Sequence, residues 1–116
     1  MIKKQSRGGS FKDYAELAVK VKNEYAVLEK KKCGRAWTKE ELAQGFVVDV
    51  GELMELVMVE AGLRGEKDKE KFSHELCDCL WSVFVLADRY KVDLAKEFPK
   101  NMEMLEKRVK EKLKNS

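Results

Sequence analysis

Two short stretches, DVGELMEL at residues 49–56 and ELCDCLW at residues 75–81, each hold acidic residues three positions apart among apolar residues. Apolar residues around the first stretch recur at spacings of three and four, which is the period of an amphipathic α-helix. The second stretch lies in a longer run, residues 76–87, that is apolar almost all round. We therefore predict one helix from residue 39 to about residue 61 and another from about residue 69 to residue 90.

Two further helices are expected on either side of this central pair, over about residues 11–32 and 94–114, where apolar residues again recur every three or four positions. Their boundaries carry the side chains typical of helix starts and stops. These residues are Ser10, Gly34, Thr38 and Asp93. The pattern predicts an all-α fold of four helices in a single domain at residues 11–116, after a flexible basic arm at residues 1–10.

The composition excludes several classes of protein. The 116 residues are one domain's worth, and 44% hydrophobic residues suffice for a packed core. Three cysteines are too few for a disulfide scaffold and indicate a reducing compartment. The net charge of +3, from 24 basic and 21 acidic residues, is too small for a dedicated nucleic-acid-binding protein. No leader peptide and no apolar run of about 20 residues is visible, so we expect a cytoplasmic protein without a membrane segment.

The apolar run at residues 76–87 is interrupted only by Asp78 and Ser82. A helix without a clear polar face is buried on several sides, and a chain this short has few helices to cover it. We therefore expect the four-helix bundle to be completed by oligomerisation, as a homo-dimer or homo-tetramer. Trp81, one turn beyond Asp78, is expected in the core or the subunit interface rather than at a ligand.

Each acidic pair presents two carboxylates from one helical face, because positions i and i+3 lie one turn apart. The pairs are Glu52 with Glu55 and Glu75 with Asp78, and Asp49 extends the first row by one turn. Carboxylates packed together in a partly apolar setting need a cation, because like charges repel and buried anions are costly. A hard divalent ion such as Mg²⁺ suits an all-oxygen ligand set. Ordinary surface ion pairs are the alternative, and the pattern alone does not decide between them.

The chain resembles the MazG-like all-α nucleoside triphosphate pyrophosphohydrolases, a superfamily that includes the dCTP pyrophosphatases. That family carries an ExxE pair on one helix and an ExxD pair on the next, and here 19 residues separate Glu55 from Glu75. Residues 49–56 resemble the family's "EvGEL.E" run, with Asp49 in place of the first Glu, and residues 75–81 resemble its "ELaDvLw" run. The similarity covers most of the domain, from Trp37 to Arg108.

The resemblance implies that Glu52, Glu55, Glu75 and Asp78 ligate Mg²⁺, with Mn²⁺ as a substitute. It also implies hydrolysis of the α–β bond of a (deoxy)nucleoside triphosphate, giving the monophosphate and pyrophosphate, as house-cleaning of the nucleotide pool. Glu55 is our choice for the base that takes a proton from the attacking water. Asp49 is expected either to reach the metal or to lie behind the ligands and orient them.

Three residues are expected to contact the substrate. Lys100, beyond a Val-Asp-Leu run that resembles the family's "iDL" motif, matches a position that contacts phosphate in relatives. The dCTP-type members carry an Asn four residues further on, where this chain has Met104, so Arg108, or Lys107 beside it, is the expected phosphate contact instead. Trp37 lies near the position of a base-stacking aromatic in the family, although it also fits as an apolar plug at the helix start.

Other functions stay open. One alternative is a phosphoribosyl-ATP pyrophosphohydrolase, because that class shares the fold and the same use of a bound metal ion. A non-catalytic nucleotide-binding helical regulator is a further alternative, although a binding module does not need all four acids. Nucleic-acid binding would rest only on residues 1–7 and the basic C-terminal end. A ferritin-like di-iron site is disfavoured, because it needs a His three residues after a Glu, whereas His74 directly precedes Glu75.

Overall fold

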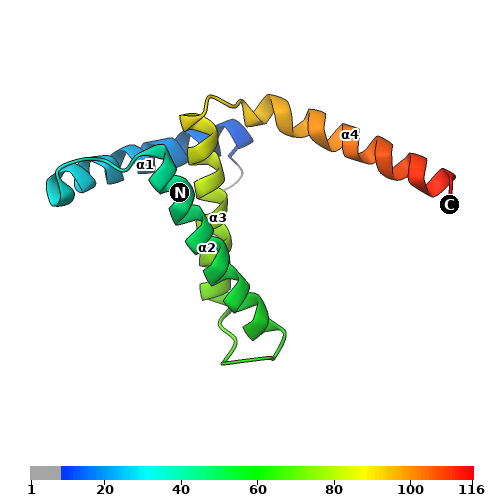
Figure 1. Cartoon of the computed structure of the whole chain (residues 1–116), viewed down its shortest axis with the longest axis horizontal. Coiled ribbons are helices and arrows are strands. Elements are labelled where there is room, and N and C mark those ends of the chain that lie inside the picture. The colour runs from blue at the N-terminus through cyan, green and yellow to red at the C-terminus, as the bar shows by residue number, and fades with distance from the viewer. Residues whose placement is uncertain (1–8) are drawn as a thin grey trace.

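The computed structural model describes residues 9–116, and this part of the chain contains four α-helices and no strand (Figure 1). The helices are α1 (Phe11–Cys33), α2 (Lys39–Glu60), α3 (Lys69–Arg89) and α4 (Leu94–Lys114). The all-α prediction is confirmed. Of the predicted arm, all but Gly9 and Ser10 lies outside the described residues. Across residues 9–116, no helix combines the length and the apolar character that a membrane span requires.

Side chains at the helix boundaries explain where the helices begin and end. Ser10 accepts a hydrogen bond from the Asp13 N–H, and the Asp13 carboxylate accepts one from the Ser10 N–H, which forms a capping box. Asp68 and Asp93 cap α3 and α4 by accepting a bond from the backbone N–H three residues on. α1 ends at Gly34, whose φ of 83° lies in the left-handed region that glycine adopts at least cost.

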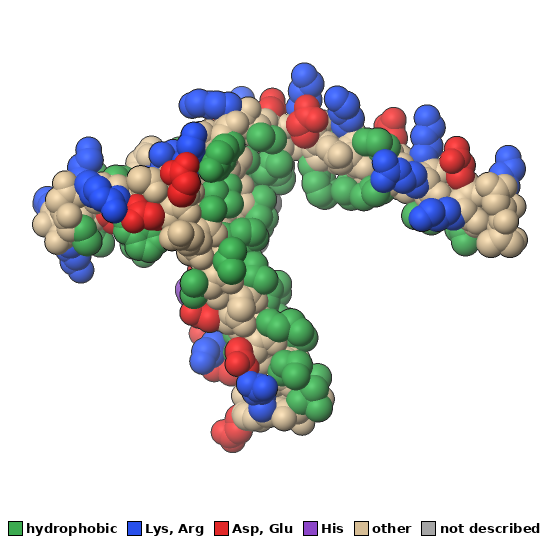
Figure 2. All heavy atoms as spheres, viewed as in Figure 1, with side chains coloured by type: hydrophobic (Ala, Val, Ile, Leu, Met, Phe, Trp, Pro, Cys, Tyr) green, Lys and Arg blue, Asp and Glu red, His purple; other side chains and the backbone are tan. Residues whose placement is uncertain are grey.

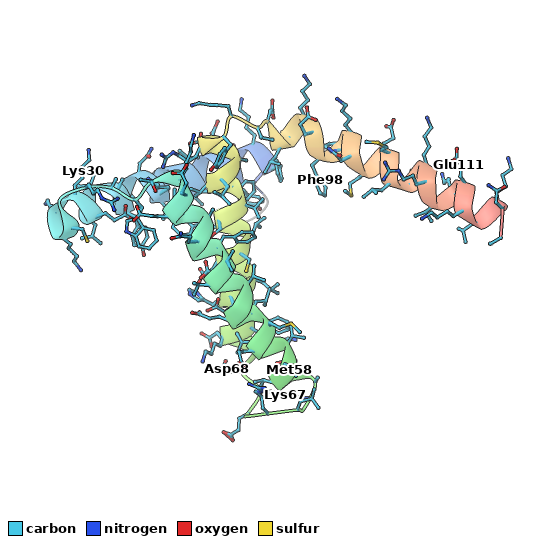
Figure 3. The ribbon with its side chains drawn as sticks, viewed as in Figure 1. Lys30, Met58, Lys67, Asp68, Phe98 and Glu111 are labelled. Carbon is cyan, nitrogen blue, oxygen red and sulfur yellow. The ribbon has the colours of Figure 1, made fainter. Side chains whose placement is uncertain are left out.

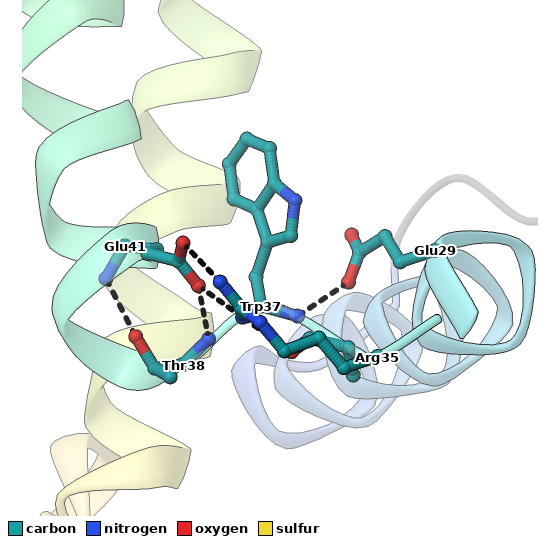
Figure 4. Close-up of polar contacts among 6 residues, drawn as sticks. Glu29, Arg35, Trp37, Thr38 and Glu41 are labelled. Carbon is teal, nitrogen blue, oxygen red and sulfur yellow. Dashed lines mark hydrogen bonds and ion pairs between the residues drawn. The ribbon is translucent and has the colours of Figure 1, made fainter. Parts of the chain in front are cut away.

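A small polar network fixes the turn between α1 and α2 (Figure 4). Thr38 and Glu41 form a second capping box, and Arg35 donates to the two Glu41 carboxylate oxygens at 2.7 and 2.9 Å. The Arg35 hydrogen bond is the main reason that the pKa of Glu41 falls to about 2. The Trp37 N–H donates to a Glu29 carboxylate oxygen at 2.9 Å. These contacts hold Trp37 at the start of α2.

α2 and α3 lie side by side as a hairpin, and α1 packs across α3 (Figure 1). Aromatic rings make much of the α1–α3 contact. The ring centroids of Phe11 and Phe84 are 5.1 Å apart, and those of Tyr25 and Trp81 are 5.8 Å apart. Trp81 Nε1 also donates to the Ala18 carbonyl at 3.0 Å. Trp81 therefore lies in a helix contact, as expected of a core residue.

Helix α4 extends away from the other three, and the molecule measures 58 Å along its longest axis (Figure 1). Within residues 9–116, α4 makes at most marginal contact with any other helix. One chain by itself therefore does not close the four-helix bundle that the sequence predicted. The apolar stripe of α4 is left largely exposed within residues 9–116. Its exposed members are Phe98, Met102, Leu105, Val109 and Leu113.

The chain exposes much more surface than a compact monomer does. Its accessible area is 9104 Å², whereas a folded monomer of 13.4 kDa exposes about 6,500 Å². Among the described residues, the buried apolar side chains are Ala18, Phe84 and Val85 alone. Hydrophobic side chains cover the underside of α4 and the adjoining side of the α2–α3 hairpin (Figure 2). This fold leaves a large apolar surface for another molecule to cover.

Candidate metal centre

The α2–α3 hairpin brings three carboxylates together. Asp49 and Glu52 lie one turn apart on α2, and Glu75 lies on α3. One carboxylate oxygen from each of the three lies within 4.8 Å of the other two. Opposite ligands of a Mg²⁺ ion are about 4 Å apart, so this spacing is close to what a single ion requires. We call these three residues the carboxylate cluster.

Glu75 is the buried member of the carboxylate cluster. The residue is 8% exposed, and its Oε2 atom has no hydrogen-bond partner within the described part of the chain. Burial is the main cause that raises the pKa of Glu75, and the Glu52 carboxylate raises it further, followed by the charges of Asp78 and Asp49. A buried acceptor left without a partner costs about 1–3 kcal/mol. A cation bound to the cluster would be that partner.

The side chains around the carboxylate cluster favour oxygen rather than sulfur as the atom that binds a metal. Burial and the charges of Asp78 and Glu52 raise the pKa of Asp49, and a hydrogen bond to Ser82 partly offsets these effects. Burial and nearby carboxylates also raise the pKa of the Cys79 thiol. Because a thiol binds metal only after it loses its proton, Cys79 is a poor ligand here. The donor set therefore fits a hard ion such as Mg²⁺ or Mn²⁺.

The other two predicted ligands, Glu55 and Asp78, stand outside this close group. Arg64, in the loop between α2 and α3, forms a hydrogen-bonded ion pair with Glu55. The Nε2 atom of His74 lies 3.2 Å from a carboxylate oxygen of Asp78, one turn away on α3. Each of these two acids is thus held by a basic side chain of the same chain. Asp78 is nevertheless close enough for its charge to raise the pKa of Glu75.

Two features of the site add to the sequence-based expectation. The sequence left open whether Asp49 reaches the metal or lies behind the ligands, and the structure places its carboxylate in the cluster. The spacing of Asp49 and Glu52 was a sufficient signal for this. The contact between Arg64 and Glu55 was not expected, because spacing along a helix says nothing of a loop residue's reach. The only signal was that Arg64 lies in the short charged loop before α3.

Of the three residues predicted to contact substrate, Trp37 precedes α2 and the other two lie on α4. The Trp37 ring is partly exposed and packs beside Gly45, where an added Cβ would lie 3.6 Å from the ring. Lys100 and Arg108 lie on α4, which extends away from the hairpin (Figure 1). The Lys100 Nζ atom lies 3.9 Å from a carboxylate oxygen of Glu97 on the same helix. Within one chain, neither basic residue of α4 is brought to the cluster.

An apolar cavity of about 380 Å³ lies where the start of α1, the end of α3 and the start of α4 meet. Phe11, Phe84 and Leu94 form part of its wall. A second cavity, of about 230 Å³, extends along the start of α4 to Phe98 and Pro99. Neither cavity is lined by a member of the carboxylate cluster. These cavities mark the junction at which α4 leaves the rest of the chain.

Comparison of the chain with protein-family models, with curated proteins and with solved structures finds no match. Its function must therefore be inferred from its own residues and their geometry. The relevant features are an oxygen-rich cluster between α2 and α3 and an exposed aromatic ring at the start of α2.

Proposed function

We propose that the chain is a Mg²⁺-dependent nucleoside triphosphate pyrophosphohydrolase of the MazG-like superfamily. It would hydrolyse the α–β bond of a (deoxy)nucleoside triphosphate to the monophosphate and pyrophosphate, as house-cleaning of the cytoplasmic nucleotide pool. The observation that carries this proposal is the buried, unpartnered Glu75 oxygen beside Asp49 and Glu52. Support also comes from the pattern of acids, because the two helices carry the ExxE and ExxD pairs of that superfamily.

The proposed ion site consists of five carboxylates, which would bind the ion or orient its ligands: Asp49, Glu52, Glu55, Glu75 and Asp78. A bound Mg²⁺ would neutralise phosphate charge and polarise the phosphoryl group that water attacks. Asp78 would reach the ion by turning away from His74, whose side chain is 72% exposed. A contact this exposed is worth at most about 1 kcal/mol, so little opposes the exchange.

Glu55 is the proposed base that accepts a proton from the attacking water. Its ion pair with Arg64 is exposed, with 59% of the Glu55 side chain and 56% of the Arg64 side chain accessible. Such a pair contributes about 0–1 kcal/mol and exchanges readily with other partners. Glu55 lies one turn beyond Glu52 on the same face of α2, so side-chain rotation would bring its carboxylate toward the cluster. Arg64 would then remain beside the site, where it can pair with a phosphate.

Trp37, Lys100 and Arg108 are the proposed substrate contacts. The exposed Trp37 ring offers a surface on which a nucleobase can stack. Lys100 and Arg108 would pair with phosphates, but within one chain they lie on α4, which extends away from the hairpin (Figure 1). We therefore propose that the working enzyme is a homo-dimer or homo-tetramer. The excess of exposed apolar surface supports this assembly. We propose neither a membrane nor a stable nucleic-acid partner.

The test is an assay with the eight common nucleoside triphosphates and phosphoribosyl-ATP, in Mg²⁺ and in EDTA, with pyrophosphate resolved from single phosphate. The proposal predicts Mg²⁺-dependent pyrophosphate and monophosphate from at least one triphosphate. Turnover of phosphoribosyl-ATP alone would instead identify the sister activity. Triphosphate binding without turnover would favour a nucleotide-binding regulator. Release of single phosphate would show that a different bond is cut and would overturn the proposal.

A further inference from the structure

We propose that two copies of the chain exchange α4, so that each α4 packs along the α2–α3 hairpin of the other copy. The inference rests on the homo-oligomer of the proposed function and does not depend on its hydrolase activity. In this arrangement, the second copy of the chain fills the open angle between α4 and the hairpin.

Both sides of this open angle are lined by hydrophobic side chains (Figure 2). Phe98 projects from α4 into the angle, whereas Glu111 lies on the opposite face of the same helix (Figure 3). On the hairpin, exposed apolar residues recur at helical spacing in one stripe on each helix. The stripes consist of Val47, Val50, Met54 and Val57 on α2 and of Leu76, Leu80 and Val83 on α3. Apolar faces of this extent are typical of a protein–protein interface.

The connection between α3 and α4 explains why the partner is a second copy rather than the chain's own α4. The backbone N–H groups of Tyr90, Lys91 and Val92 donate to carbonyls in the last turn of α3 at 2.9, 3.2 and 2.8 Å. Asp93 then caps α4 directly, so the connection has no slack. Folding α4 back onto its own hairpin would require a different backbone path over residues 90–93, which these bonds and the Asp93 cap oppose. Packing on another copy keeps them.

The lengths of the helices and the available area suit this exchange. α4 has 21 residues and α2 has 22, so both are about 31–33 Å long and can lie along each other fully. The accessible area of 9104 Å² exceeds that of a compact monomer by about 2,600 Å². Covering half of this excess on each of two copies would bury about 2,600 Å² in total, which is the size of an obligate homodimer interface.

The charges of the two elements are complementary. α4 carries seven Lys or Arg residues and four Glu residues, whereas α2 carries six acidic residues and one Lys. Exchange would therefore place the most basic helix of one copy against the most acidic helix of the other. A two-fold axis makes each of these contacts twice, so the exchange itself is complete with two copies.

The first test uses the unmodified full-length chain. Light scattering should give a mass of twice 13.4 kDa, or of a tetramer built from two such dimers. In a mixture of isotope-labelled and unlabelled chains, filtered NOE spectra should show contacts from the Met102 methyl group to methyl groups of the hairpin in the other copy. A monomer would overturn both the exchange and the proposed homo-oligomer. An oligomer whose α4–hairpin contacts are absent, or occur only within one chain, would overturn the exchange alone.

The second test separates the apolar contact from the charge of α4. Leu105→Lys breaks the apolar stripe while it makes α4 more basic, and Glu103→Lys changes the charge on a different face of the same helix. Leu105→Lys should weaken the dimer on the order of 100-fold or more, because a symmetric dimer contains the change twice. Glu103→Lys should keep the wild-type mass. Equal masses for both variants would overturn the proposal, and if Leu105→Lys does not fold, the NOE contacts of the wild type decide it.

Discussion

Replacing Glu75 by Gln should stabilise the chain in the absence of Mg²⁺. The buried Glu75 carboxylate faces Asp49 and Glu52, and its Oε2 atom has no partner in the described part of the chain. Gln keeps the shape of the side chain, removes its charge and adds an N–H donor for the two neighbouring carboxylates. Relief of an uncompensated buried group is worth about 1–3 kcal/mol. A change of this size raises the melting temperature by about 4 °C per kcal/mol.

Mg²⁺ should reverse the order of stability of the wild type and Glu75→Gln. An ion that binds only the folded chain stabilises it by about 2.7 kcal/mol at 100 times its Kd. The wild type should gain this amount, whereas Glu75→Gln lacks one ligand and should gain little. The wild type is therefore expected to be less stable than the variant in EDTA and more stable in Mg²⁺.

The loss of folding stability caused by the buried Glu75 carboxylate should also depend on pH. The pKa of Glu75 is raised in the folded chain above its ordinary value of 4.5, so the unfolded chain loses this proton first as the pH rises. Well below pH 4.5 both states keep the proton and Glu75 carries no penalty. Stability of the metal-free wild type should fall as the pH rises from 4.5 through the raised pKa, and Glu75→Gln should lack this fall.

The assay is thermal unfolding followed by circular dichroism at fixed protein concentration. Wild type, Glu75→Gln and the exposed control Glu103→Gln are compared in EDTA and in Mg²⁺, at pH 4 and at pH 7. Glu103→Gln should match the wild type in all four conditions. A lower stability of Glu75→Gln in EDTA would refute the reasoning, because it would show that the carboxylate has a stabilising partner. Absence of any Mg²⁺ stabilisation of the wild type would refute the cation site.

Three further predictions address other contacts. The Glu41 carboxylate should titrate near pH 2 by NMR, and Arg35→Gln should return its pKa toward 4.5; an unchanged value would contradict the role of Arg35. Arg64→Gln should release Glu55 and tighten Mn²⁺ binding about two- to five-fold by EPR titration, as expected for a weak exposed pair. Equal tightening in a Glu55→Gln background would point to overall charge instead. Trp37→Leu should raise KM for the preferred triphosphate on the order of tenfold through lost stacking, and an unchanged KM would exclude base contact.

The helices were predictable because their determinants are local. The capping box at Thr38 and the glycine at Gly34 act within one helical turn, and they place the helix boundaries as expected. The position of α4 was not predictable in the same way. An apolar stripe such as that around Leu105 shows that a helix needs a partner, but it does not specify the partner. Within the described chain that stripe remains exposed.

The candidate site likewise combines features that the sequence predicted with features that depend on packing and could not be predicted. The i, i+3 spacing placed Asp49 and Glu52 on one face, and the hairpin of consecutive helices brought Glu75 to them. The burial of Glu75 was not predictable from spacing, because it depends on how closely α2 and α3 pack. The ion pair between Arg64 and Glu55 depends on the path of the loop between α2 and α3, which the helical periodicity of the sequence does not predict.

Product analysis by ³¹P NMR tests the central claim most directly. Wild type, Glu75→Gln and Glu103→Gln are incubated with Mg²⁺ and the preferred triphosphate at equal protein concentration. We predict monophosphate and pyrophosphate from the wild type and from Glu103→Gln, and a rate at least about 100-fold lower from Glu75→Gln, because that variant lacks a ligand of the ion. An unchanged rate in Glu75→Gln, or release of single phosphate by the wild type, would contradict the proposed site and reaction.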